Sequence, residues 1–268
     1  MIDEVFKKTL LTLIRTAGQF IKSEKGTIDR QDIDTKSHNS FVTYVDKKTE
    51  EMLVEGLSQL IPDSGFIAEE DTAGENNSPW RWIIDPLDGT TNFINNIYPV
   101  SVSVALQYNN KTIAGIVYEI GQDELFYAFE NEPAMLNQKP IQVSPTDKLA
   151  NSFVATGFPY YDFIRIDKFM QTLAHLMKNT TGVRRLGSAA TDLAYVACGR
   201  YDAFFEYSLS PWDVAAGAFI VQQAGGKVAD FSRGNNYLFG KEIVATNKQL
   251  SNEFMNLICE KMTAEQKQ

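Results

Sequence analysis

Histidine and cysteine are scarce in this sequence, with two residues of each among 268. Cys198 and Cys259 lie far apart and form no Cys-x-x-Cys pair, so both are predicted to be small buried apolar residues. His38 and His175 are too few to build a zinc or iron centre from imidazole groups. A metal site of the histidine type is therefore not expected.

Long apolar runs are also missing. No run approaches the ~20 residues that a helix needs to cross a bilayer. Residues 1–24 contain Asp3 and Glu4, and their apolar residues recur at helical spacing, which is not the pattern of a signal peptide. The sequence therefore predicts a soluble, cytoplasmic protein with no membrane partner.

Basic residues are outnumbered, with 25 Lys and Arg against 34 Asp and Glu and a formal net charge of −9 at pH 7. Nucleic acids and membrane surfaces are anionic and repel an acidic protein, so neither is expected as a partner. The same charge balance means that a phosphate compound can bind only beside a local cation. That cation must come from an Arg and Lys cluster or from bound metal ions.

The hydrophobic pattern indicates a single unit built from two halves. An apolar content of 44% over 268 residues is enough for one large core or two closely packed halves. The first half, about 1–145, is predicted to contain helices over 1–24 and 47–60 and an antiparallel meander over 99–107, 112–119 and 124–129. The second half, about 146–268, is predicted to alternate: strand 152–156, helix 164–178, strand 183–186, helix 189–198, strand 202–207, helix 212–224, strands 227–230 and 242–246, and helix 250–261.

The most informative segment is an apolar strand that runs into two aspartates, WIIDPLDGTTNF at 82–93. Pro86 is expected to end the strand, and Asp88 returns a second carboxylate to the same region as Asp85. Gly89 lets the backbone approach a ligand, and Thr90 can open a helix whose N–H groups face an anion. Paired carboxylates beside such donors suit a hard cation that also binds a substrate phosphate.

Three other acids fit the same site, although each has a simpler interpretation. Glu69 follows an apolar strand in IAEED at 67–71, where it could belong to a solvated turn. Asp213 stands in the first turn of a helix after Pro211, where it could only cap that helix. Asp46 could likewise cap the helix at 47–60. The residues alone leave these alternatives open.

Taken together, the motifs resemble the inositol monophosphatase family. The segment DPLDGTTNF at 85–93 is similar to the first signature of the family, and WDVAAG at 212–217 with the later Gly225-Gly226 is similar to the second. The segments TYVD at 43–46, AEE at 68–70 and GSAA at 187–190 stand in the expected order, so the resemblance runs over nearly the whole chain. It implies a magnesium-dependent, lithium-sensitive phosphatase of α+β class, with a layered αβαβα sandwich of the sugar-phosphatase type, usually a homodimer.

The resemblance also implies a metal cluster of two to three Mg²⁺ ions. Glu69, Asp85 and the Leu87 carbonyl are expected to bind one ion. Asp85, Asp88 and Asp213 are expected to bind a second, with a third, weaker ion near Glu69.

The resemblance further implies how water and substrate are held. Asp46 and Thr90 are expected to position the attacking water, with Glu69 as a third catalytic residue. The substrate is expected to contact the backbone of Gly89 and Thr90 on its phosphate side and Ala189 and Glu206 on its polyol side, beside Asp88 and Asp213.

The sequence thus predicts hydrolysis of a small polyol monophosphate, in the first place inositol 1-phosphate to inositol and phosphate, by metal-activated water. Such esters hydrolyse very slowly unaided, so positioning and charge neutralisation must supply the rate. The alternatives are a 3′-phosphoadenosine 5′-phosphate, NADP or fructose 1,6-bisphosphate phosphatase, or a non-catalytic metal-binding interaction module.

Four further residues or segments leave the substrate open. Arg184 and Arg185 could hold a second phosphate or lie at the surface or an interface. The aromatic segment 158–161 could form a slot for a nucleotide base. Lys36 stands near a position where the family often carries a lysine of the phosphate or metal site, but one residue closer to Asp46.

Overall fold

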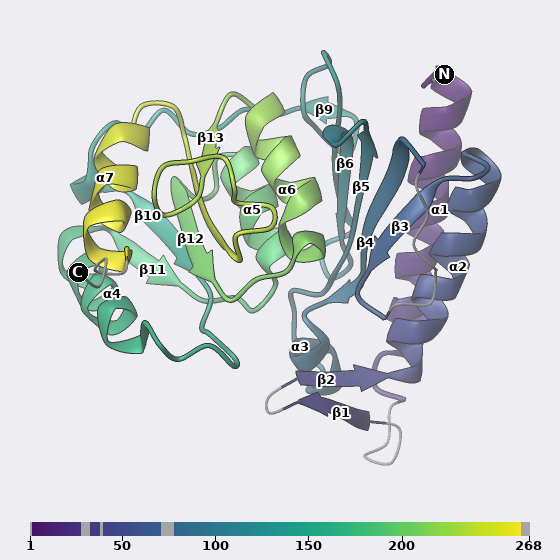
Figure 1. Cartoon of the computed structure of the whole chain (residues 1–268), viewed down its shortest axis with the longest axis horizontal. Helices are drawn as coiled ribbons and strands as arrows, with labels where there is room; N and C mark the ends of the chain where they lie inside the picture. Colours follow the sequence, from purple (N-terminus) through teal and green to yellow (C-terminus); the bar gives the residue numbers. More distant parts are fainter. Residues whose placement is uncertain (1, 28–32, 38–39, 71–77, 264–268) are drawn as a thin grey trace.

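Helices and sheets alternate in five layers in the computed structural model, which describes residues 2–27, 33–37, 40–70 and 78–263. In Figure 1 two helices cover one face of a seven-stranded sheet, two more lie between that sheet and a five-stranded sheet, and a last pair covers the outer face of the second sheet. These pairs are α1 (Glu4–Glu24) with α2 (Tyr44–Leu60), α5 (Ala189–Ala197) with α6 (Pro211–Gln223), and α4 (Ile166–Asn179) with α7 (Ser251–Met262). The predicted αβαβα sandwich is confirmed.

The first two helices form where the sequence predicts them, with one difference at the start of α2. In α1 the side chain of Asp3 accepts a hydrogen bond from the Phe6 N–H at 2.8 Å and caps the helix. The second helix begins at Tyr44 rather than 47, because Thr43 is its N-cap and Asp46 closes a capping box with it. Asp46 is therefore the third residue of the helix and not its cap.

The seven-stranded sheet contains the predicted meander. Its order is β3-β4-β5-β6-β7-β8-β9, with β3 parallel to β4 and every other neighbouring pair antiparallel. Asn109 and Asn110, at φ 49° and 62°, make the turn between β5 and β6. The strands are β3 (Gly65–Ala68), β4 (Trp80–Asp88), β5 (Ser101–Tyr108), β6 (Lys111–Glu119), β7 (Glu124–Phe129), β8 (Met135–Leu136) and β9 (Lys139–Pro140).

Strand β4 corrects one prediction, since Pro86 does not end it. The strand extends to Asp88, and its pairing with β5 joins Asp85 to Ser103 and then Asp88 to Ser101, with an irregular register between the two pairs. Pro86 lies in this irregular segment, where its missing N–H costs no ladder hydrogen bond. Both aspartates therefore stay on the end of one strand.

The five-stranded sheet has the order β11-β10-β12-β14-β13, in which β10 is parallel to β11 and β12 while β14 is antiparallel to β12 and β13. Every helix and strand predicted after residue 146 is present, with ends within two residues of the prediction. The strands are β10 (Phe153–Thr156), β11 (Gly182–Arg184), β12 (Ala203–Tyr207), β13 (Lys227–Ala229) and β14 (Glu242–Thr246).

The middle helices pack closely against both sheets and join the two halves through one apolar cluster. This cluster includes Ile83 and Ala105 of the first sheet, Leu193 and Ala216 of the middle helices and Phe204 of the second sheet. A Cβ atom added to Gly115 in β6 would lie 2.6 Å from the backbone oxygen of Ala216, so glycine is what lets α6 approach the sheet. This close packing fixes where the N-terminal end of α6 lies relative to β4.

The remaining elements are short: a hairpin of β1 (Ile33–Ser37) and β2 (Ser40–Thr43), α3 (Thr90–Ile94) and the 3₁₀ helix η2 (Leu149–Asn151). Cys198 and Cys259 form no disulfide and are partly buried. No helix in the described ranges is both long and apolar enough to cross a membrane.

Candidate active site

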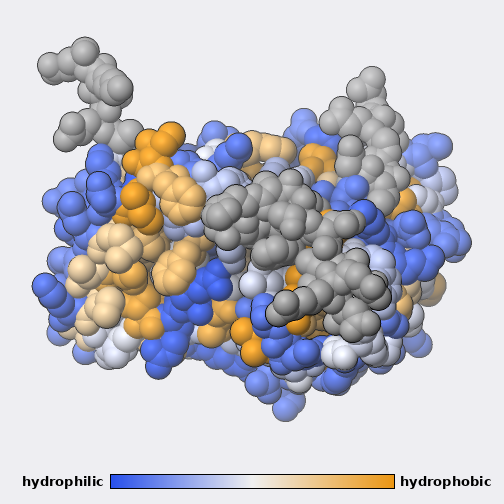
Figure 2. Space-filling view, turned by 90° about the horizontal axis from the view of Figure 1, so that it is seen from below, coloured by the Kyte–Doolittle hydropathy of each residue, from blue (hydrophilic) through white to orange (hydrophobic). Residues whose placement is uncertain are grey.

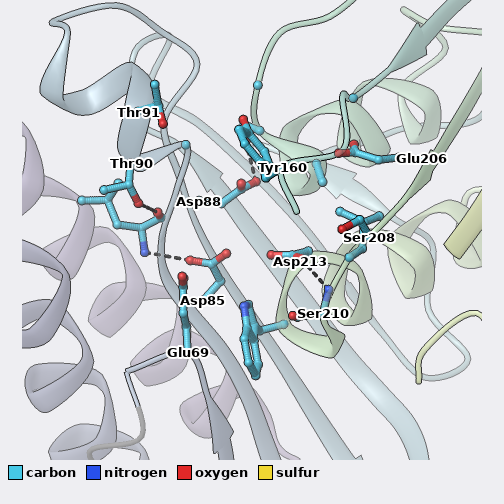
Figure 3. Close-up of a pocket in the computed structure, with 18 of the residues that line it drawn as sticks. Glu69, Asp85, Asp88, Thr90, Thr91, Tyr160, Glu206, Ser208, Ser210 and Asp213 are labelled. Atoms are coloured by element: carbon cyan, nitrogen blue, oxygen red, sulfur yellow. Dashed lines mark hydrogen bonds between the residues drawn. The ribbon is translucent and has the colours of Figure 1, made fainter. Parts of the chain in front are cut away.

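A pocket of about 260 Å³ opens where the end of β4 meets the N-terminal ends of α5 and α6 (Figure 3). All the acids of the predicted metal cluster line it: Glu69, Asp85, Asp88 and Asp213. Leu87, Gly89, Thr90, Ala189 and Glu206 line it as well, so the structure brings the predicted ion, phosphate and polyol residues together.

Glu69 and Asp85 are neighbours because two parallel strands end side by side. The register of β3 with β4 pairs Ala68 with Ile84, so the next residue of each strand is one of the two acids. Asp85 is 1% exposed, and its Oδ1 accepts a hydrogen bond from the Leu87 N–H at 3.0 Å. The strand end thus places two carboxylates at the same edge of the sheet.

Asp88 is held from the other half of the chain. Its Oδ2 accepts hydrogen bonds from the Ser188 hydroxyl at 2.6 Å and from the Ala190 N–H at 2.8 Å, at the start of α5. Burial raises the pKa of Asp88 to about 6, and the bonds from Ser188 and Ala190 act in the opposite direction. The N-terminal end of α5 therefore fixes this carboxylate and favours its charged form.

Asp213 reaches the same pocket from the first turn of α6. Its carboxylate accepts a hydrogen bond from the Ser210 N–H at 2.6 Å, which is the capping interaction that its position suggests. It also lines the pocket. Capping and pocket lining are therefore combined in one side chain.

Thr90 lines the pocket, whereas Asp46 is buried, does not line it and reaches it only through its contact with Thr90. The Thr90 hydroxyl oxygen lies 3.1 Å from Asp46 Oδ1 and 3.1 Å from the Leu87 carbonyl oxygen. The other oxygen of Asp46 accepts bonds from the Thr43 N–H and hydroxyl at 2.8 and 2.7 Å, and Asp46 is 1% exposed. The capping box of α2 thereby holds the carboxylate that faces Thr90.

Gly89 makes the turn between β4 and α3. It has φ 95°, and a Cβ atom there would lie 2.9 Å from the Pro99 carbonyl oxygen. The five-residue α3 begins at Thr90 directly after it. A residue with a side chain would therefore be strained at this corner of the pocket.

The acids of the cluster repel one another. Burial and the charges of Glu69, Asp88 and Asp213 all raise the pKa of Asp85, and burial and Asp88 raise that of Asp213. Within the described ranges, no three acidic, histidine or cysteine side chains already stand as a complete metal-binding group. Hard divalent cations nevertheless bind carboxylate oxygens, and several carboxylates line this one pocket. These residues therefore fit such an ion.

The opposite side of the pocket is formed by β12 and the segment after β10. Glu206 is 6% exposed, and its carboxylate atoms lie 1.9 to 2.1 Å from where a Cβ atom of Gly157 would be. Ala189 is 7% exposed at the start of α5. Figure 3 shows Tyr160 and Glu206 on the far side of Asp88 from Thr90.

The two arginines left open by the sequence differ in position. Arg185 lines the pocket, whereas Arg184 is exposed and lies over the Phe153 ring at 4.8 Å. Phe158, part of the suggested aromatic slot, lines a separate, more apolar cavity beside α4, while Tyr160 and Tyr161 line the pocket that holds the acids.

Other residues of interest were missed or lie outside the described parts. The side chain of Lys36 and all of His38 and Asp71 lie outside them. Sequence reasoning gave no role to Ser188, although its place directly before a predicted helix is a signal for a capping hydroxyl.

Comparison with protein families and curated proteins identifies relatives of the whole chain. The model of the inositol monophosphatase family matches residues 3–266. An inositol-1-monophosphatase of Mesorhizobium japonicum is 36% identical over 249 residues, 92% of this chain and 94% of that protein. A Nus factor SuhB of Pasteurella multocida is 40% identical over 247 residues, 91% of this chain and 92% of that protein.

Solved structures are similar over the same extent. The extragenic suppressor protein suhB of Bartonella henselae has a TM-score of 0.90 at 34% identity and covers 95% of this chain and 98% of its own. An IMPase of Thermotoga maritima has a TM-score of 0.85 at 31% identity, with 93% and 95% covered. The chain therefore belongs to the inositol monophosphatase family and has the fold of its phosphatases.

Proposed function

We propose that this protein is a magnesium-dependent phosphatase that releases phosphate from the monophosphate of a small polyol, with inositol 1-phosphate as the favoured substrate. One observation carries the proposal: four acids from separate parts of the chain line a pocket together with Thr90, whose hydroxyl is hydrogen-bonded to the buried carboxylate of Asp46. A binding module would need the acids but not this second pair.

The residues assigned to the ions are those that the family resemblance implied. Glu69, Asp85 and the Leu87 carbonyl would hold one Mg²⁺, and Asp85, Asp88 and Asp213 a second, with a third near Glu69. When bound, such ions neutralise phosphate charge and lower the pKa of water. Their charge would also offset the repulsion that raises the pKa of Asp85.

The chain itself orients the water and the phosphate. When the Thr90 hydroxyl turns toward Asp46, it donates a hydrogen bond to Oδ1. The Thr90 oxygen is then free to accept a hydrogen bond from the attacking water. The corner at Gly89 brings the backbone of Gly89 and Thr90 to the pocket wall, where it would hold the phosphate. Ala189 and Glu206 then face the alcohol that leaves.

Asp213→Asn tests the assignment without removing the capping bond, because an amide oxygen can still accept from the Ser210 N–H. We expect the rate of phosphate release from inositol 1-phosphate to fall about 1,000-fold. The substitution removes the negative charge of a proposed metal ligand, and the bound ion contributes several kcal/mol of transition-state stabilisation. EDTA should abolish release by the unmodified protein, and Mg²⁺ should restore it.

Asp167→Asn is the matched control, because Asp167 is exposed on α4 and should leave turnover unchanged. A well-folded Asp213→Asn protein with full turnover would contradict the proposal. We also expect Li⁺ to inhibit in the presence of saturating Mg²⁺, and a titration without effect would count against the family-type ion site.

The dimensions of the pocket favour a small substrate. A cavity of about 260 Å³ is smaller than the roughly 300–1,000 Å³ typical of pockets for drug-sized ligands. Among the sequence-based alternatives, NADP and 3′-phosphoadenosine 5′-phosphate are therefore less suitable, and a panel with both compounds and fructose 1,6-bisphosphate tests this ranking.

The names of several relatives favour a role as a Nus factor as the second candidate function. Proteins named Nus factor SuhB are 38–40% identical to this chain over about nine tenths of its length. The same Asp213→Asn protein separates the two functions in a strain that lacks its own SuhB. Complementation by this variant would show a Nus-factor role that does not need catalysis, and failure to complement even by the unmodified chain would remove the candidate.

A further inference from the structure

Arg185 is a donor-rich side chain of the pocket that the proposed reaction does not use. Its guanidinium donates a hydrogen bond to the Tyr160 hydroxyl and lies 5.4 and 5.5 Å from the ring centres of Phe158 and Tyr160. It forms no ion pair with a carboxylate in the described ranges, and its buried Nε–H has no hydrogen-bond partner there. The side chain is therefore held in place while donors remain for a ligand.

Glu206 supplies acceptors to the same pocket. Its carboxylate occupies the space that a side chain at residue 157 would fill, so Gly157 is what permits this position. A Cβ atom at residue 157 would clash with the carboxylate at the end of the flexible Glu206 side chain. Replacing Gly157 with alanine should therefore displace this carboxylate rather than unfold the protein. Arg185 and Glu206 thus offer a donor and an acceptor to the same pocket.

We propose that Arg185 determines specificity for the alcohol: its guanidinium donates to one hydroxyl oxygen of the leaving polyol while Glu206 accepts from another. Tyr160 and Gly157 act as positioning residues, one for each partner. The inference rests on the proposed phosphatase function and deepens it by naming the side chain that distinguishes polyol esters from esters of other alcohols.

A hydroxyl group suits this position better than a second phosphate. Asp192, which is 1% exposed, and Glu206 both interact electrostatically with Arg185, so two buried acids stand near its guanidinium. Burial raises the pKa of both acids well above the ordinary range, so this side of the pocket disfavours negative charge. A second phosphate would bring negative charge there, whereas a hydroxyl brings none. The structure therefore favours a polyol monophosphate over a bisphosphate.

Three substrates test the proposal on the whole protein with Mg²⁺: inositol 1-phosphate, p-nitrophenyl phosphate, whose leaving group has no further hydroxyl, and fructose 1,6-bisphosphate. For Arg185→Met we expect kcat/KM for inositol 1-phosphate to fall about tenfold, the effect of one lost hydrogen bond, with p-nitrophenyl phosphate within about twofold. Arg185→Lys, which keeps a donor, should recover part of the loss. Arg184→Met, the exposed neighbour, should change none of the three values.

Gly157→Ala tests the acceptor side independently and should show the same contrast between inositol 1-phosphate and p-nitrophenyl phosphate. Equal losses on both substrates, or no loss on either, would overturn the inference. A loss confined to fructose 1,6-bisphosphate would also overturn it and would make Arg185 part of a second-phosphate site. If the unmodified protein hydrolyses none of the three, the proposed function fails; if it hydrolyses p-nitrophenyl phosphate and Arg185→Met does not discriminate, only the specificity inference fails.

Discussion

At the scale of single residues, the hydroxyl of Thr90 is shared between two acceptors at equal distance. It lies 3.1 Å from Asp46 Oδ1 and from the Leu87 carbonyl oxygen, and a hydroxyl has one proton to donate. When the Thr90 hydroxyl donates its hydrogen bond to Asp46, the Leu87 carbonyl is left available for an ion, as its predicted role requires. The orientation of one hydroxyl therefore links the proposed water-positioning pair to the proposed ion site.

Replacing Thr90 tests this link. We expect Thr90→Val, which keeps the shape of the side chain, to lower kcat about 100-fold, since a residue that positions a proton transfer commonly contributes 10²–10⁴-fold. Thr90→Ser retains the hydroxyl and should keep most of the activity. The measurement is phosphate release at saturating Mg²⁺ together with the melting temperature, and a folded Thr90→Val protein of undiminished kcat would show that the hydroxyl is dispensable.

The acids also show how far single residues can be interpreted from sequence. Asp46 and Asp213 each have a capping interpretation and a site interpretation. Both close capping boxes at the third position of their helices, Asp213 lines the pocket, and Asp46 contacts Thr90, which lines it. Motif resemblance identified the full set, whereas spacing alone left each acid ambiguous. The bond from Ser188 to Asp88 joins residues 100 positions apart, and no local pattern reports such a contact.

At the scale of helices and strands, periodicity predicted nearly all of the second half, because each element there has one buried face. The two boundary errors have local causes. The start of α2 depends on the side-chain bonds of Thr43 and Asp46, which lie before the apolar repeat begins. The continuation of β4 past Pro86 depends on an irregular register with β5, which is a property of the pair of strands and not of either sequence.

The turn between β6 and β7 supports a prediction about pH. Glu119, at the end of β6, is 1% exposed and accepts hydrogen bonds from the Gly121 and Gln122 N–H groups at 3.0 and 2.6 Å. Burial raises its pKa above the ordinary 4.5 in the folded protein, so the folded state holds its proton to higher pH than the unfolded chain does. The contribution of Glu119 to the free energy of unfolding is therefore fully present below about pH 4.5. It is lost as pH rises through the pKa of Glu119 in the folded protein.

Glu119→Gln removes this titration, so the melting temperature of the variant relative to the unmodified protein should increase as pH rises from about 4.5 toward 7. Thermal unfolding of both proteins in matched buffers measures the difference. A difference that stays constant across this range would show that Glu119 does not titrate differently on folding. Glu55→Gln, at an exposed position of α2, serves as the matched control.

At the scale of the whole molecule, the five layers leave an apolar surface exposed on the C-terminal half. Exposed apolar side chains gather on and before α4, on the side where Figure 2 shows the orange surface of the C-terminal half. They are Phe158, Tyr161, Phe163, Ile164, Met170 and Met177. Exposed apolar patches of this kind mark interaction sites, and the family resemblance implies a homodimer, so we propose that a second copy of the chain covers this surface.

Ile164→Asp tests this proposal, because Ile164 is 94% exposed and a charge there should not disturb the fold. We expect the dimer to dissociate at concentrations at least about tenfold higher than for the unmodified chain. Sedimentation at a series of concentrations measures the shift. Val5→Asp, an exposed apolar position on α1, is the control and should have no effect. A monomeric unmodified chain, or a dimer unaffected by Ile164→Asp, would contradict the proposal.

The contact of Asp88 with the start of α5 also has a consequence for biosynthesis. The first three acids of the cluster leave the ribosome more than a hundred residues before Asp213, and the groups that hold Asp88 emerge between them. Contacts of such sequence separation form late, after the intervening chain has been ordered. A nascent or truncated chain that ends before α6 lacks Asp213, one of the proposed ion ligands, so we expect no release of phosphate from such a chain.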